Sequence, residues 1–120
     1  FYHLLPQFSG VTFHQINSNP DAGEIIHQSC PKLYREDGIH DVSVRCVIDA
    51  AADAKNIFKK FYIEKDLKGK KQISSGRVWK SNDFQIQHLR IIYNLFNNDI
   101  VKYYLEKKLS KTKPKLFSSI

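Results

Sequence analysis

The feature that most constrains the fold is a long helical pattern of apolar residues that follows an acidic turn at residues 36–38. The apolar positions recur every three or four residues and would form one stripe on a helix ending near residue 62. They are Val47, Ala50, Ala51, Ala54, Phe58 and Phe61. Asp41 near the start and Lys59 near the end suit the dipole of such a helix. Because the alanines allow close packing, we expect this stripe to pack on a sheet.

Two short strands flanking a polar loop are predicted before this helix. Residues 11–16 alternate in polarity and are rich in β-branched and aromatic types, and residues 24–30 resume an extended pattern that Pro31 ends. Between them, residues 17–23 form a dense run of turn-forming residues. The pattern predicts a strand-loop-strand unit, and loops of this kind often carry function.

Weaker patterns follow in the second half of the chain. Residues 72–80 indicate a short hairpin or extended segment, and Ser81 is a predicted N-cap for a helix over 81–96. A last helix is expected at about 100–109, followed by a polar, lysine-rich and frayed tail. We therefore expect an α/β chain with three parts: short strands plus a long helix at 1–66, a hairpin and helical region at 67–109, and a basic flexible tail at 110–120.

Composition excludes several classes of protein. The chain has 120 residues, of which 42% are hydrophobic, and this argues against disorder. No run approaches the roughly 18 apolar residues of a membrane span, and the first residues do not resemble a signal peptide. Two cysteines fit a reducing, cytoplasmic compartment. The five histidines lack metal-ligand spacing, and no glycine-rich phosphate loop is present, so no metal is expected.

Charge is distributed unevenly along the chain. The formal net charge is +7, but residues 1–50 carry three cations against six anions, while residues 51–120 carry sixteen cations against six. A basic surface attracts phosphates of nucleotides, nucleic acids or membranes. The cations are almost all lysine, whereas base readers and phosphate forks favour arginine. A solvated lysine-rich face is therefore favoured, and nucleic acid is not the expected partner.

The loop that carries Asp21 is the sharpest local feature for chemistry. Asp21 is a lone carboxylate between two apolar strands, and Gly23 permits a positive φ or a close backbone approach. A carboxylate there could orient or deprotonate a histidine or an amine. The alternative is that Asp21 only caps a turn with its own side chain, as aspartate commonly does. Physical reasoning alone favours the turn.

These segments resemble the signature of the formyltetrahydrofolate-dependent formyltransferases. That family has V-T-x-H, a short gap, and then D-T-G-x-I-I-x-Q. Here the matching residues are Val11-Thr12-Phe13-His14, Asp21-Ala22-Gly23-Glu24-Ile25-Ile26 and Gln28. Residues 4–10 are similar to the family's L-L-P-x-Y-R-G loop. Residues 76–84 and 88–93 are similar, more weakly, to the C-terminal region of the sugar N-formyltransferases, so the resemblance spans most of 4–106.

The resemblance implies a Rossmann-like domain, of which this chain would be the C-terminal part, and a specific reaction. A formyl group would pass from N10-formyltetrahydrofolate to a small-molecule amine, carried by a nucleotide-linked sugar, in a chain that could form a homodimer. By motif, the implied catalytic residues are Asp21 and His14, with His3 as a histidine near the family's upstream position. The implied cofactor-binding residues are Leu5, Pro6, Asn17, Asn19 and Gly23.

The chain also departs from the family pattern, and this leaves alternatives open. The family's upstream histidine position falls on Phe1, the arginine of its Y-R-G motif is Ser9, and Gly10 runs directly into Val11. The groups that polarise the formyl carbonyl are therefore not at their family positions, and their loss would slow transfer by orders of magnitude. A catalytically inactive remnant or binding module is one alternative, and a basic nucleic-acid-binding domain is another.

Overall fold

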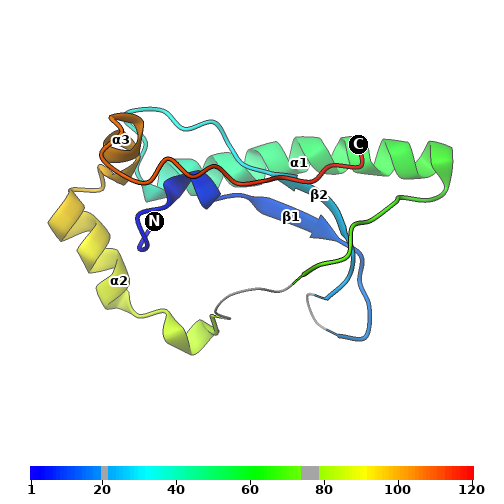
Figure 1. Cartoon of the computed structure of the whole chain (residues 1–120), viewed down its shortest axis with the longest axis horizontal. Coiled ribbons are helices and arrows are strands. Elements are labelled where there is room, and N and C mark those ends of the chain that lie inside the picture. The colour runs from blue at the N-terminus through cyan, green and yellow to red at the C-terminus, as the bar shows by residue number, and fades with distance from the viewer. Residues whose placement is uncertain (20–21, 74–78) are drawn as a thin grey trace.

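The described structure mixes one small sheet with helices. Figure 1 shows the computed structural model, in which residues 1–19, 22–73 and 79–120 are described. In chain order the elements are η1 (Pro6–Phe8), β1 (Val11–His14), β2 (Ile25–Ser29), α1 (Ile39–Glu64), η2 (Ser81–Asp83), α2 (Ile86–Arg90), η3 (Ile91–Leu95) and α3 (Ile100–Leu105). η1 and η2 are 3-10 turns, whereas η3 is π-helical. The expected mixture of strands and helices is confirmed.

β1 and β2 form the predicted strand-loop-strand unit as an antiparallel hairpin. Val11 pairs with Ser29 and Phe13 with His27, but His14 pairs with Ile25, so the register shifts after Phe13. The backbone N–H of Gln15 donates to the carbonyl of Glu24 at 2.9 Å and closes the loop beyond the strands. Both strands are shorter than predicted because the turn-forming loop residues extend the connection on either side.

The C-terminal segment lies along β2. The N–H of Gln28 donates to the carbonyl of Phe117 at 2.8 Å, and the N–H of Ser119 donates to the carbonyl of Ile26 at 3.0 Å. The buried Gln7 side chain also donates to two carbonyls of this segment, those of Ser110 and Thr112. Residues 110–120, expected as a frayed tail, therefore run back from α3 along the sheet (Figure 1).

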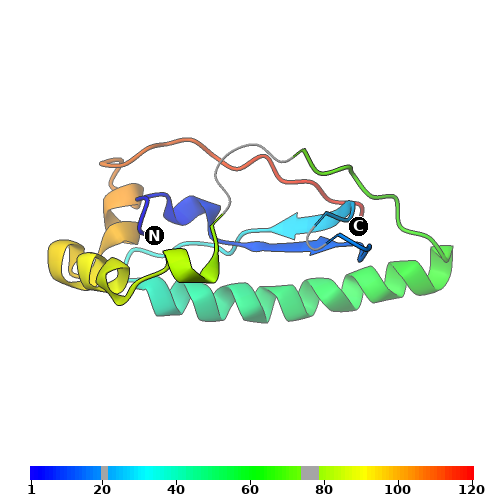
Figure 2. The same ribbon diagram turned by 90° about the horizontal axis from the view of Figure 1, so that it is seen from below.

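α1 covers one face of the hairpin and runs past it at both ends (Figure 2). It begins after Gly38, whose N–H donates to the carboxylate of Asp41 at 2.8 Å. The next N–H, from Ile39, donates to the Asn98 side chain at 2.9 Å. The helix ends where Lys65 takes a left-handed φ of 58°. A side chain remote in sequence thus helps to fix the start of the predicted long helix.

The face of α1 that meets the hairpin differs from the predicted one. Val42 and Ile57 are buried, and Ala50 and Ala54 are half-buried, but Val47, Phe58 and Phe61 are exposed. The physical reason lies in polar anchors on the inner side. They are Asp53 against His27, Arg45 against Asp37, and Lys60 donating to the carbonyl of Ser119. These anchors turn much of the apolar stripe away from the narrow sheet.

The helix predicted from Ser81 is present only from Ile86 to Leu95, as α2 followed by η3, and its predicted start is wrong. The structure has the short η2 turn, an extended Phe84, and then α2 with Gln85 as its N-cap. Side chains that bond to nearby backbone favour turns over continued helix, and the Asp83 carboxylate accepts the N–H of Lys80 at 2.8 Å. The last helix ends at Leu105, before the predicted end, because Lys107 has a left-handed φ of 63°. Most of the expected 72–80 hairpin lies outside the described residues.

Candidate functional site

Four of the implied site residues lie on the β1–β2 hairpin, whereas Asp21 lies outside the described residues. His14 ends β1, and Asn17, Asn19 and Gly23 follow in the loop. The side-chain oxygen of Asn17 accepts the N–H of Asn19 at 3.0 Å, and this bond rigidifies the first half of the loop. One hairpin therefore carries all four residues.

Gly23 is required by a close backbone approach. A Cβ placed there would overlap the carbonyl oxygen of Gln15, so any larger residue would force the loop open. The Gly23 carbonyl also accepts the Gln72 side-chain amide at 2.6 Å. The close backbone approach that Gly23 permits is therefore present. The approaching backbone is that of Gln15, on the other side of the same loop.

His14 is half-buried, and a backbone carbonyl orients its ring. Its Nδ1 lies 2.9 Å from the carbonyl oxygen of Gln15. A carbonyl only accepts hydrogen bonds, so Nδ1 donates this one. The contact orients the imidazole at the end of β1 that leads into the loop.

His3, Leu5 and Pro6 lie at the other end of β1 from this loop (Figures 1 and 2). Pro6 is buried in η1. The His3 ring contacts the Trp79 ring, with centroids 5.1 Å apart. Both residues line an aromatic cavity of about 210 Å³ together with Tyr2, Lys80, Asp83, Phe84 and His88. The structure does not bring His3 beside the Asp21 loop.

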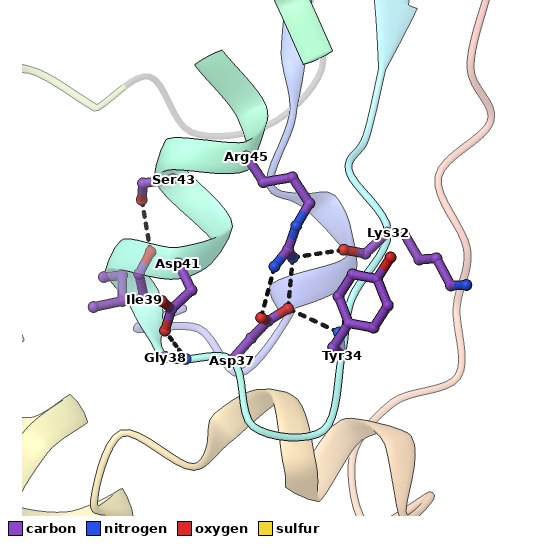
Figure 3. Close-up of polar contacts among 8 residues, drawn as sticks. All are labelled: Lys32, Tyr34, Asp37, Gly38, Ile39, Asp41, Ser43 and Arg45. Carbon is purple, nitrogen blue, oxygen red and sulfur yellow. Dashed lines mark hydrogen bonds and ion pairs between the residues drawn. The ribbon is translucent and has the colours of Figure 1, made fainter. Parts of the chain in front are cut away.

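The buried Asp37 and the half-buried Arg45 form an ion pair that was not expected from the sequence (Figure 3). The guanidinium makes two bonds to the carboxylate, at 2.7 and 2.8 Å, and the N–H of Tyr34 adds a third at 2.7 Å. The hydrogen bonds from Arg45 lower the pKa of Asp37 below its ordinary value despite the opposing effect of burial. In the sequence Asp37 only forms part of the acidic turn before the long helix, and no local pattern signals a partner eight residues away.

A second missed cluster connects three distant segments through His27. Its Nδ1 lies 2.9 Å from the Ser118 hydroxyl, and its Nε2 lies 3.3 Å from the Asp53 carboxylate. Ser118 also donates to the carbonyl of Ile120 at 3.1 Å. The imidazole therefore ties β2 to α1 on one side and to the C-terminal segment on the other. Strand periodicity could have placed His27 on one face of β2, but not its partners.

The two cysteines are poor nucleophiles in these surroundings. Burial raises the pKa of Cys30, and the neighbouring Cys46 raises it further. Burial also raises the pKa of Cys46. The raised pKa values keep both thiols protonated at neutral pH. Because the thiolate is the reactive form, neither cysteine is a ready nucleophile.

Three further observations concern metal ligands, membrane spans and known proteins. Within residues 1–19, 22–73 and 79–120, no three His, Cys, Asp or Glu side chains gather closely enough to hold a metal ion. No helix in those ranges combines the length and hydrophobicity needed to cross a membrane. No protein-family model, curated protein or solved structure matches the chain.

Proposed function

We propose that this chain is an N-formyltransferase of the formyltetrahydrofolate-dependent type, acting on the amine of a nucleotide-linked sugar in a reducing, cytoplasmic compartment. The proposal rests on the resemblance of residues 11–14 and 21–28 to the family signature. The amine nitrogen would bond to the formyl carbon, the bond from that carbon to N10 of the folate would break, and one proton would pass from the amine to N10.

The observation that carries the proposal is the hairpin geometry. The family signature falls on β1, the connecting loop and β2, and the Gln15 carbonyl orients the His14 ring where β1 enters the loop. Gly23 and the Asn17–Asn19 bond restrain the loop on either side of Asp21. By resemblance, Asp21 and His14 would take part in transferring the proton that leaves the amine. The loop backbone would lie against the pterin ring of the folate. A preorganised base contributes about 10²–10⁴-fold to such a proton transfer.

A second candidate is a module that binds the folate but does not transfer the formyl group. The position of His3 favours it, because this histidine lies among aromatic residues at the other end of β1. Without a group to polarise the formyl carbonyl, binding could persist while the rate falls by orders of magnitude. The Rossmann-like architecture implied by the resemblance belongs to both candidates.

The two candidates are separated by measuring binding and turnover on the same protein. The chain is incubated with N10-formyltetrahydrofolate and a nucleoside-diphosphate-linked amino sugar, and tetrahydrofolate release is followed by absorbance. We expect Asp21→Asn to slow release by about 100-fold or more. Asp66→Asn, an exposed aspartate just beyond α1, is the matched control and should retain the full rate. Folate binding without release would identify the second candidate, and no folate binding would overturn both.

A further inference from the structure

The outward face of α1 is an apolar stripe that nothing in the described chain covers. Its five large side chains are strongly exposed: Val44 58%, Val47 69%, Ile48 63%, Phe58 71% and Tyr62 76%. With Ala51 between them, they stand at helical spacings of three, four and seven residues and share one side of the helix. We call these six residues the outer stripe. An exposed contiguous apolar patch of this kind marks an interaction surface.

The inner face of the same helix is more polar than the outer stripe. Arg45, Asp53 and Lys60 all point inward and are held by Asp37, His27 and the Ser119 carbonyl. These anchors fix the rotation of α1 on the hairpin. The helix therefore cannot bury its outer stripe by turning on its own axis without breaking all three contacts.

Charges along α1 identify a partner for the outer stripe. Apart from the three inward-facing anchors, the first half of the helix carries Asp41 and Asp49, while the second half carries Lys55 and Lys59 with Glu64. A second α1 in antiparallel orientation would set each acidic half beside a basic half. The two helix dipoles would then also be opposed, which is the favourable arrangement. A parallel copy would instead place like charges together.

We propose that the chain forms a homodimer in which the outer stripes of two α1 helices pack antiparallel across a two-fold axis near Ala51. Centred there, Val44 of one copy faces the partner's Phe58. Asp41 and Lys59 flank the outer stripe on the same edge, so each Asp41 comes beside the partner's Lys59. Alanine at the axis lets the helices approach to the usual 8–10 Å or so. The stem of Lys55 lies along the apolar surface while its amine reaches the solvent edge.

Association is tested by analytical ultracentrifugation of the whole chain over about 1–100 µM, a range that covers ordinary homodimer affinities. We expect a species of twice the 14.0 kDa chain mass. Phe58→Glu places a charge in the apolar interface, opposite the partner's Val44, and should weaken association by at least about 30-fold, as for other buried anchors. The matched control is Ile73→Glu, because Ile73 is 87% exposed but lies outside α1. Circular dichroism checks that both variants keep their helix.

Cross-linking tests the two-fold axis itself. In a chain whose own cysteines are changed by Cys30→Ser and Cys46→Ser, Ala51→Cys should form an intermolecular disulfide under mild oxidation. Asn56→Cys is the matched control, because Asn56 is exposed on α1 but lies off the outer stripe. Two Asn56 positions would stand about ten residues apart along the paired helices, roughly 15 Å, beyond disulfide reach.

Several outcomes would overturn the homodimer. A chain that remains monomeric throughout the concentration range contradicts it, whether or not the outer stripe then binds lipid vesicles or another protein. Dimerisation that survives Phe58→Glu unchanged, or equal cross-linking by Ala51→Cys and Asn56→Cys, would place the interface elsewhere. None of these results depends on formyl transfer, so the homodimer and the proposed reaction can fail separately.

Discussion

At the scale of single residues, Asp37 shows how a charge is kept inside this fold. Its carboxylate is almost fully buried, yet each of its oxygens accepts a hydrogen bond from Arg45. The guanidinium also stacks over the Tyr34 ring, 4.6 Å from the centroid, and donates to the carbonyl of Lys32 at 2.8 Å. Arg45, in the first half of α1, therefore holds the turn before the helix in place through these contacts.

Replacement of Asp37 by asparagine should lower the free energy of unfolding by about 2 kcal/mol at neutral pH, because buried donors lose their charged acceptor. The folded pKa of Asp37 is lowered, so its stabilisation is present above the unfolded pKa and is lost as the pH falls through the folded value. Urea unfolding at several pH values should show the difference between wild type and Asp37→Asn shrinking in acid.

Glu36→Gln provides the comparison for that experiment. Glu36 is paired with Arg35 at 2.8 Å, but both side chains are largely exposed. Exposed pairs contribute little, so this variant should unfold like the wild type at every pH. A difference between wild type and Asp37→Asn that stays constant on acidification would show that ionisation of Asp37 does not stabilise the fold.

At the scale of elements, local sequence patterns determine which elements form, whereas long-range contacts determine which face of α1 is buried. The strand-loop-strand unit and the existence of α1 were predictable because alternation, turn residues and helical spacing are local signals. The buried face of α1 was not predictable. Val47 and Phe58 fit the predicted helical stripe, but both are exposed. The side of α1 that faces the hairpin instead carries Asp53, which pairs with His27 on β2. For the candidate site, the sequence placed His14 and Gly23 on one hairpin but gave no signal that His3 lies apart from them.

Asn98 is the clearest case of one element being ordered by another. Its side chain accepts the N–H of Ile39 at the start of α1, and its own φ is 58°. Asn98→Ala should therefore lower the free energy of unfolding by about 1–2 kcal/mol, as loss of a helix cap does. Asn97→Ala is a matched control, because Asn97 has a similar φ of 48° and isolates the backbone effect. Equal losses in thermal or chemical unfolding would mean that the cap contributes nothing beyond backbone preference.

At the scale of the whole molecule, the chain is elongated because α1 is longer than anything it packs on. The radius of gyration is 16.2 Å, against about 13.6 Å for a compact domain of this length. α1 spans roughly 39 Å, whereas a four-residue strand spans roughly 13 Å. Few apolar side chains are fully buried in the described chain. Contacts between distant segments, including the C-terminal segment on β2, therefore contribute much of the cohesion.

Removal of residues 117–120 tests whether the C-terminal segment stabilises β2. Hydrogen exchange measures the effect at single backbone amides. The N–H of Gln28 donates to the carbonyl of Phe117, whereas the N–H of Ile25 donates to the carbonyl of Lys70, each at 2.8 Å. In the truncated chain the Gln28 amide should exchange with solvent at least about tenfold faster, since a bonded amide exchanges only when its bond opens. The Ile25 amide serves as the control within the same strand and should keep its protection. Faster exchange at both amides would mean that the C-terminal segment holds the whole hairpin together, and an unchanged Gln28 amide would mean that the segment does not pair with β2 in solution.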